Sequence, residues 1–146
     1  MAVDMMKVFA KAYVCKGSAS PDEAKKEFAS LNPGSIVQTG SAESAKNEFF
    51  VEMLAAQTLR AGSVGGLLAK KPEMDFLLRL AGTTQISRAI KQYGSTKGVP
   101  FLLVVAGPRE IRESRSFKAM ELPRRKLSKK ELDRIEGAAL LSALRP

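Results

Sequence analysis

Apolar and polar residues alternate near the N-terminus, over residues 5–15. A period of two is typical of a strand that buries one face, because successive side chains of a strand point to opposite sides. The apolar face consists of Met6, Val8, Ala10, Ala12 and Val14, and the opposite face includes Lys7 and Lys11. The pattern therefore predicts a strand with one buried face at the start of the chain.

A helix is predicted to follow this strand, from Ser20 to about Leu31. Serine can accept a hydrogen bond from the first turn, Pro21 suits the first helical position, and Glu23 completes a capping box. A proline and a glycine then break the helical pattern at residues 33–34. These local signals define a first strand and a first helix.

The middle of the chain is predominantly helical. A short apolar run at residues 36–37 predicts a second strand, and residues 41–61 then show the longest helical pattern. A glycine-rich loop with two lysines follows. Two further helices are predicted over residues 73–81 and 84–93, joined at Gly82.

The C-terminal third predicts a buried strand, an edge strand and a final helix. Residues 101–105 form a near-continuous apolar run, which is typical of a strand covered on both faces. Residues 116–122 are a candidate edge strand, and Ser128 with Glu131 forms a capping box that opens the last helix. The order of elements predicts an α/β fold: a single domain, residues 1–146, with a small mixed β-sheet packed against several helices.

The sequence around Gly82 predicts a helix start that attracts anions. An apolar helix stops at this glycine, and Thr83 is expected to cap the next helix. The free N–H groups of a first turn, together with the helix dipole, favour a negatively charged ligand. Gly94 is expected to end this second helix in the left-handed conformation.

The helix that begins here has a polar, cationic face and an apolar face. Spacings of three and four place Gln85, Arg88 and Gln92 together, with Lys91 beside them, and Arg79 lies just before the turn. The apolar side, which is expected to anchor the helix, consists of Ile86, Ala89, Ile90 and Tyr93. Gln85 is either a reader of base edges or a solvated helix residue, and the sequence favours neither.

The composition is compatible with a polyanionic partner. The chain has 24 Lys and Arg against 15 Asp and Glu, a formal charge of +9, and residues 109–134 alone have ten Lys or Arg against five Asp or Glu. Such a field accelerates encounter with phosphate backbones, although a basic surface without a nucleic-acid role would have the same composition.

The residue types that the sequence lacks make several kinds of catalytic and metal-binding site less expected. Histidine is absent, which removes the commonest general base and the usual neutral zinc ligand, so neither catalysis, a metal nor a cofactor is expected. Cys15 is the single cysteine, so no disulfide can form within the chain. No apolar run is long enough to cross a bilayer, and a cytoplasmic protein is expected.

The run FLLRLAGTTQISRAIKQYG, followed by the strand VPFLLVVAG, resembles the signature of the small tRNA-binding accessory subunit of the KEOPS complex. In that family an apolar helix leads into a small residue and a glycine, a polar pair ending in Gln-Ile, and then Ala-Ile and a glycine. The match is close over residues 76–106. Elsewhere it rests on the order of the elements and on an apolar C-terminal helix. Many members have arginine where this chain has Thr84.

The resemblance implies a non-catalytic subunit that supports threonylcarbamoyl-adenosine modification of tRNA. Such subunits bind the 3′ CCA tail of tRNA and dock on the kinase-like ATPase subunit, while another subunit performs the transfer. Carried over to this chain, the tail site centres on Arg79, Gly82, Thr83, Gln85 and Lys91. The surrounding cations of the expected tRNA-binding set are Arg60, Lys70, Lys71 and Arg88. The expected surface for the kinase-like subunit consists of Ile135, Leu140, Leu141 and Leu144.

Other interpretations of the same sequence stay open. A small nucleotide-dependent enzyme would use the glycine-rich loop after residue 61 or the loop after residue 106, although no Gly-Lys-Ser/Thr motif follows the first loop. A basic DNA-binding protein would use residues 73–94 as a helix-turn-helix, although helices joined almost without a turn fit that motif poorly. The C-terminal helix either packs wholly on its own sheet or leaves its end exposed to a partner.

Overall fold

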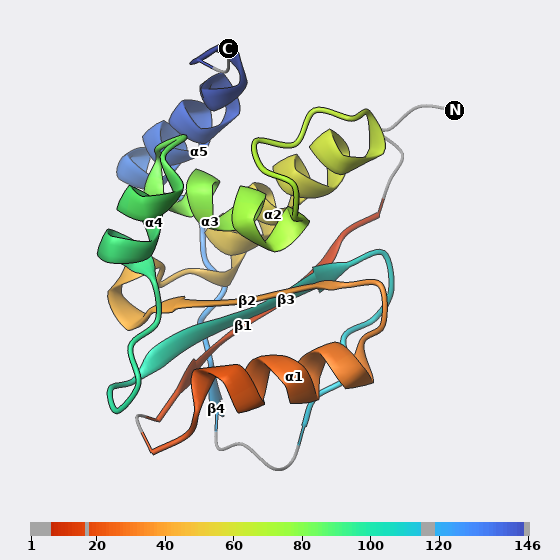
Figure 1. Ribbon diagram of the computed structural model, residues 1–146, viewed down its shortest axis with the longest axis vertical. Coiled ribbons are helices and arrows are strands. Elements are labelled where there is room, and N and C mark those ends of the chain that lie inside the picture. The colour runs from red at the N-terminus through yellow and green to blue at the C-terminus, as the bar shows by residue number, and fades with distance from the viewer. Residues whose placement is uncertain (1–6, 17, 115–118, 145–146) are drawn as a thin grey trace.

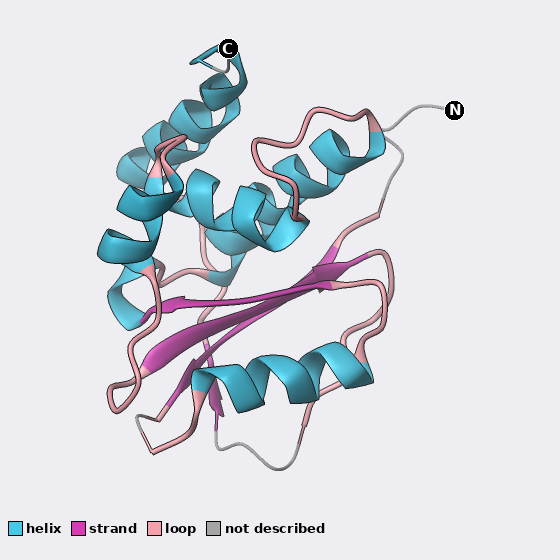
Figure 2. Ribbon diagram, in the orientation of Figure 1, coloured by secondary structure: helices cyan, strands magenta, loops and turns pink. Residues whose placement is uncertain are grey.

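A four-stranded sheet lies at the centre of the molecule, and helices cover both of its faces (Figures 1 and 2). The computed structural model describes residues 7–16, 18–114 and 119–144. The strands are β1 (Phe9–Cys15), β2 (Ile36–Ser41), β3 (Phe101–Gly107) and β4 (Ala119–Glu121), in the spatial order β2-β3-β1-β4. The α/β class and the single domain are confirmed. Every neighbouring pair is antiparallel, so the expectation of a mixed sheet is wrong: β1 and β2 run in the same direction, but β3 lies between them.

The central strand is β3, in which all seven residues are buried. It pairs with β1 on one side and β2 on the other, so Val104 lies opposite both Ala12 and Gln38. This confirms the doubly covered strand that the apolar run predicts. The candidate edge strand is confirmed as β4, which pairs with the end of β1, while residues 116–118 lie outside the described residues.

The first helix covers one face of the sheet. Helix α1 (Pro21–Leu31) starts as predicted, since the Ser20 hydroxyl accepts a hydrogen bond from the Glu23 N–H at 3.3 Å. Phe28 packs there against Tyr13 of β1, with ring centroids 5.6 Å apart. Strand β1 therefore buries both of its faces, and the expectation of one buried face is wrong.

The other helices lie on the opposite face, seen above the sheet in Figure 1. They are α2 (Glu48–Ser63), α3 (Pro72–Ala81), α4 (Ile86–Tyr93) and α5 (Lys129–Leu140), with short 3-10 turns η2 (Ala42–Ser44) and η3 (Leu141–Leu144). Phe50, Leu54, Phe76 and Leu78 pack there on Ala12 and Val104. The helix predicted over residues 41–61 divides, because Asn47 caps α2 and the chain before it forms η2.

Candidate nucleic-acid interface

The junction between α3 and α4 is a turn of four residues. Gly82 ends α3 in the left-handed conformation at φ 72°, and its N–H donates to the Leu78 carbonyl oxygen at 2.8 Å. The predicted helix stop is confirmed. The predicted cap is wrong, because α4 begins after Gln85 and the Thr83 hydroxyl accepts the Gln85 N–H at 3.1 Å, closing the turn. No side chain caps α4, so its first N–H groups have no acceptor from the N-cap residue.

Helix α4 is attached to the molecule by a narrow strip. Ala89 is its one buried residue, whereas Ile86 is 46% exposed and Ile90 is 51% exposed. The expectation that both isoleucines anchor the helix is therefore wrong, because no described element covers that part of the apolar face. Gly94 ends α4 with φ −66°, not in the left-handed conformation; a Cβ there would collide with the Ile90 carbonyl oxygen.

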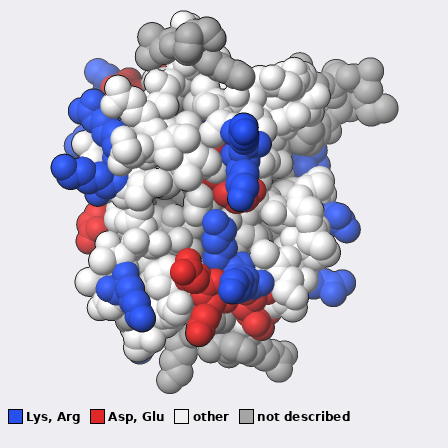
Figure 3. Space-filling view, in the orientation of Figure 1, with Lys and Arg blue, Asp and Glu red and all other residues white. Residues whose placement is uncertain are grey.

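The polar side chains of α4 are available to a ligand. Gln85, Arg88 and Lys91 are exposed, and within the described residues neither cation takes part in an ion pair. Lys and Arg gather along the edge of the molecule formed by α4 in Figure 3, whereas charges of both signs mix over α1. Thr84 is exposed in the same turn. The turn and α4 thus combine N–H donors, cations and exposed apolar carbon.

Arg79 does not belong to this surface. It is only 4% exposed, and its Nε and Nη2 atoms donate to the two carboxylate oxygens of Asp75 at 2.7 and 3.2 Å. Asp75 is fully buried and also accepts hydrogen bonds from the Thr58 hydroxyl and the Leu68 N–H. Arg79 is therefore not accessible to an RNA ligand in this structure, because its guanidinium is buried in an ion pair with Asp75.

The remaining cations of the expected site are exposed but lie elsewhere. Arg60 is near the C-terminal end of α2, and Lys70 and Lys71 are in the loop that leads into α3. Helix α3 has ten residues between Lys71 and Gly82, so it separates them by about 15 Å. The structure therefore does not gather the expected tRNA residues into one pocket; it distributes them along the length of α3.

The expected kinase-subunit surface divides into buried and exposed residues. Leu141 is 4% exposed and belongs to the core, and Ile135 is half-buried against α2 and α3. Leu140 is 66% exposed. Leu144 ends η3, and its side chain lies outside the described residues. Helix α5 packs through Ile135 and Ala138, and the buried Leu141 belongs to η3.

Two residues that the sequence patterns did not single out organise the N-terminal end of α5. Asn47 is 2% exposed and forms hydrogen bonds with the backbone of Arg125 and with Glu131. The Arg134 guanidinium donates to the carbonyl oxygens of Ser44 and Leu80, both at 3.0 Å. The asparagine directly before Glu48 is a signal for a helix cap, but its partners are 78 and 84 residues away in sequence.

Reactive and metal-binding groups are scarce in the described part of the chain. Burial raises the pKa of the Cys15 thiol to about 11, so the thiol stays protonated and unreactive at neutral pH. The described residues contain no group of three or more Asp, Glu or Cys side chains placed to hold a metal ion. None of the described helices is long and apolar enough to span a membrane.

No protein-family model matches the chain, and no match is found for it among curated proteins.

Proposed function

We propose that this protein is a non-catalytic, cytoplasmic KEOPS subunit that binds the 3′ CCA tail of tRNA and docks on the kinase-like ATPase subunit. In this role it supports threonylcarbamoyl-adenosine modification of tRNA without performing the transfer. One observation carries the proposal: the uncapped start of α4 is exposed beside Gln85, Arg88 and Lys91, at the point where the sequence resembles the family signature.

The chemistry of this surface suits a single-stranded RNA end. The free N–H groups at the start of α4 and the helix dipole favour a phosphate, and Arg88 and Lys91 add positive charge. The exposed Ile86 and Ile90 offer apolar surface to an unstacked base, and the Gln85 amide can pair with a base edge. Phosphate contacts supply affinity and base contacts supply preference for the tail sequence.

A titration of full-length and tail-trimmed tRNA at two salt concentrations tests the tail site. We expect removal of the CCA nucleotides to weaken binding strongly, since the trimmed RNA lacks the segment that α4 recognises. The double substitution Arg88→Ala and Lys91→Ala is expected to lower affinity and to reduce the slope of log K against log salt by about 1 to 2. Lys16→Ala with Lys26→Ala, two exposed lysines at the end of β1 and on α1, removes the same charge as a control. Equal affinity for both RNAs contradicts tail capture.

Gln85→Ala separates base recognition from phosphate binding. If the amide contacts a base, the variant loses about 1 to 3 kcal/mol of discrimination between CCA and an altered tail. Its salt dependence is expected to match that of the wild type, because no charge is removed. The same titration with a tail of different sequence measures the effect; a uniform loss on every tail would show that Gln85 acts only through the fold of the turn.

The docking surface is tested by two neighbouring leucines of opposite exposure. Leu140→Glu is expected to abolish capture of the kinase-like ATPase subunit, because it places a charge in the proposed apolar contact. The fold is expected to stay intact, because the Leu140 side chain is exposed in the isolated protein. Leu141→Glu is expected to unfold the chain, since it inserts a charge into the core. Circular dichroism and co-purification measure both. Normal capture by the folded Leu140→Glu variant would remove α5 from the interface.

A further inference from the structure

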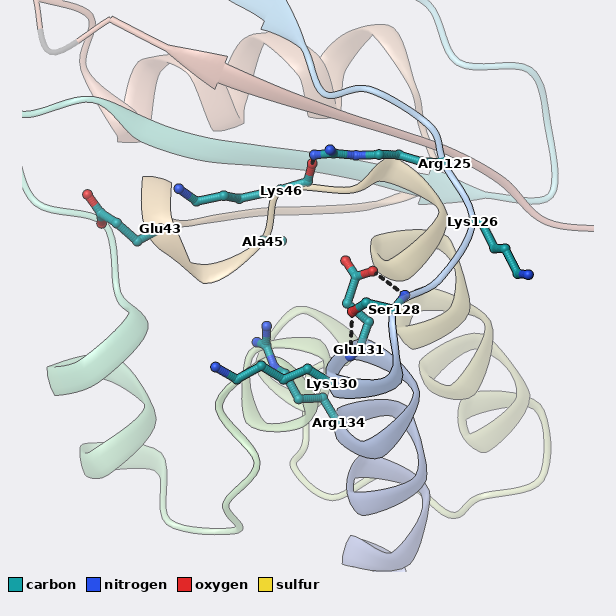
Figure 4. Close-up of a pocket in the computed structure, with 9 residues that line it drawn as sticks. All are labelled: Glu43, Ala45, Lys46, Arg125, Lys126, Ser128, Lys130, Glu131 and Arg134. Atoms are coloured by element: carbon teal, nitrogen blue, oxygen red, sulfur yellow. Dashed lines mark hydrogen bonds between the residues drawn. The ribbon is translucent and has the colours of Figure 1, made fainter.

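A cleft of about 520 Å³ opens at the N-terminal end of α5, and the residues that line it are not those of the turn that the proposed function uses (Figure 4). Three segments form its walls: η2 and the residues after it, the chain before α5, and the first two turns of α5. The cations that line it are Lys46, Arg125, Lys126, Lys130 and Arg134, and the carboxylates are Glu43 and Glu131. Positive charge therefore dominates the lining.

The carboxylate of Glu131 forms hydrogen bonds within the protein at the wall of the cleft. Its Oε1 atom accepts hydrogen bonds from the Ser128 N–H at 2.9 Å and from Asn47 Nδ2 at 3.2 Å. Burial by itself would raise the pKa of Glu131, but hydrogen bonds from Ser128 and Asn47 and the positive charge of Arg125 outweigh it and lower the pKa. The group thus stays ionised as part of the α5 capping box. Glu43 lies at the outer end of the cleft in Figure 4.

The five cations are not neutralised by ion pairs. In the described ranges none of them has a carboxylate oxygen within 4 Å, although Lys11, Arg79 and Arg124 all do. Glu131 attracts Arg125 and Arg134 at longer range, but five cations face two carboxylates in this lining, which favours an anion. Arg124, by contrast, forms an ion pair with Glu52 at 3.0 Å, so its charge is partly neutralised within the protein.

The cleft is also fixed in shape before any ligand arrives. The Asn47 side chain accepts a hydrogen bond from the Arg125 N–H and donates one to the Arg125 carbonyl oxygen, both at 3.1 Å. These bonds hold the loop segment that contains Arg125 and Lys126. Arg134 is half-buried and stacks over the Phe50 ring at 4.4 Å, which fixes its guanidinium between Ser44 and Leu80. A pre-organised set of donors loses little conformational freedom on binding.

The lining favours a phosphate backbone over a base. None of the lining residues is aromatic, so the cleft offers no aromatic ring to a base, while lysine and arginine are the residues that contact phosphate. Arg134 donates to the carbonyl of Leu80, two residues before Gly82, so the cleft adjoins the α3–α4 turn. One RNA molecule can therefore reach both places.

We propose that this cleft binds the phosphodiester backbone of an RNA strand, as a second contact that does not read sequence. The inference rests on the proposed function, because it takes the ligand to be the RNA whose tail lies at α4. Lys46, Lys126 and Lys130 are exposed lysines of the lining, and Figure 4 shows Lys126 pointing away from the other two. Arg125 and Arg134 donate hydrogen bonds to backbone carbonyl oxygens, which hold their guanidinium groups in place.

The test compares two triple variants of equal charge. Lys46→Ala, Lys126→Ala and Lys130→Ala together remove the three lysines of the cleft. In the control, Lys16→Ala, Lys25→Ala and Lys26→Ala remove one lysine just after β1 and two from α1. Both are titrated with full-length and tail-trimmed tRNA at two salt concentrations. We expect the cleft variant to bind both RNAs about tenfold or more weaker, with a salt slope reduced by about 2 to 3, and the control to change little. The fold-change in Kd is expected to be the same for both RNAs, because the cleft and the tail site have no residue in common.

The possible results separate the two proposals. If the cleft variant matches the control in affinity and slope, the cleft inference is overturned even when tail capture holds. If wild-type protein binds both RNAs equally but the cleft variant still loses affinity and slope, tail capture fails and the cleft inference stands. Loss of capture of the kinase-like ATPase subunit with unchanged RNA affinity would assign the cleft to a protein partner and overturn the inference. An absence of RNA binding by the wild-type protein would overturn both.

Discussion

Helices α3 and α4 follow each other in the chain and have opposite environments. Six successive residues of α3, from Asp75 to Leu80, are buried, whereas α4 buries only Ala89. Helix α3 packs against α2, α5 and β2 as well as α4, while the contacts of α4 are with α3 and β2. Helix α3 is therefore part of the core, whereas α4 is a surface helix that packs on α3 and β2.

An arginine in α3 is paired inside the protein, whereas an arginine in α4 is exposed to solvent. Arg79 of α3 is buried and its charge is cancelled by Asp75, so it contributes to cohesion and not to the external field. Arg88 of α4 is exposed, with no ion pair in the described part of the chain, so its charge is available to an anion. Positive charge in a sequence becomes a binding surface only where the fold gives it no internal partner.

The largest expected difference between the helices concerns these two arginines. Arg79→Ala leaves the Asp75 carboxylate buried without its cation and is expected to lower the free energy of unfolding by about 3 to 5 kcal/mol. Arg88→Ala is expected to change it by about 0.5 kcal/mol or less, because an exposed side chain is removed. Urea denaturation of both variants measures the difference. A small effect for Arg79→Ala would mean that water reaches the ion pair.

Truncation of apolar side chains is expected to give the next largest difference. Leu78 is fully buried, so Leu78→Ala leaves a cavity and is expected to cost about 2 to 5 kcal/mol. Ile90 is 51% exposed, so Ile90→Ala is expected to cost less than about 1 kcal/mol. Thermal unfolding followed by circular dichroism measures both. Similar losses at the two positions would show that Ile90 is more closely packed in solution than its exposure in the structure indicates.

The smallest expected effect concerns the glycine between the two helices. Gly82→Ala forces a Cβ into the left-handed conformation, with open space around it, and is expected to destabilise the protein by about 1 kcal/mol. Gly137→Ala, in the interior of α5 where the φ angle is not positive, is expected to stabilise it by a similar amount. Chemical denaturation resolves the opposite signs. Equal signs would contradict the assignment of Gly82 to a conformational role.

The sequence by itself determined the features that depend on a few neighbouring residues. The caps at Ser20 and Ser128, the stop at Gly82 and the buried strand β3 all follow from residue types within one turn or one strand. Such features are local, because a capping side chain bonds backbone groups two or three residues away in the same turn. For the same reason the class of the fold could be predicted from the order of its elements.

Only the tertiary structure decided which faces are covered and which charges are paired. Periodicity identifies an apolar face of α4, but whether Ile86 and Ile90 are buried depends on a neighbouring element that the period does not specify. Thr83 accepts the Gln85 N–H because the turn, not the helix, places the two together. The cleft at α5 likewise depends on Asn47, which meets Arg125 across 78 residues of chain. Contacts at that sequence separation leave no local pattern, because the fold alone brings the two segments together.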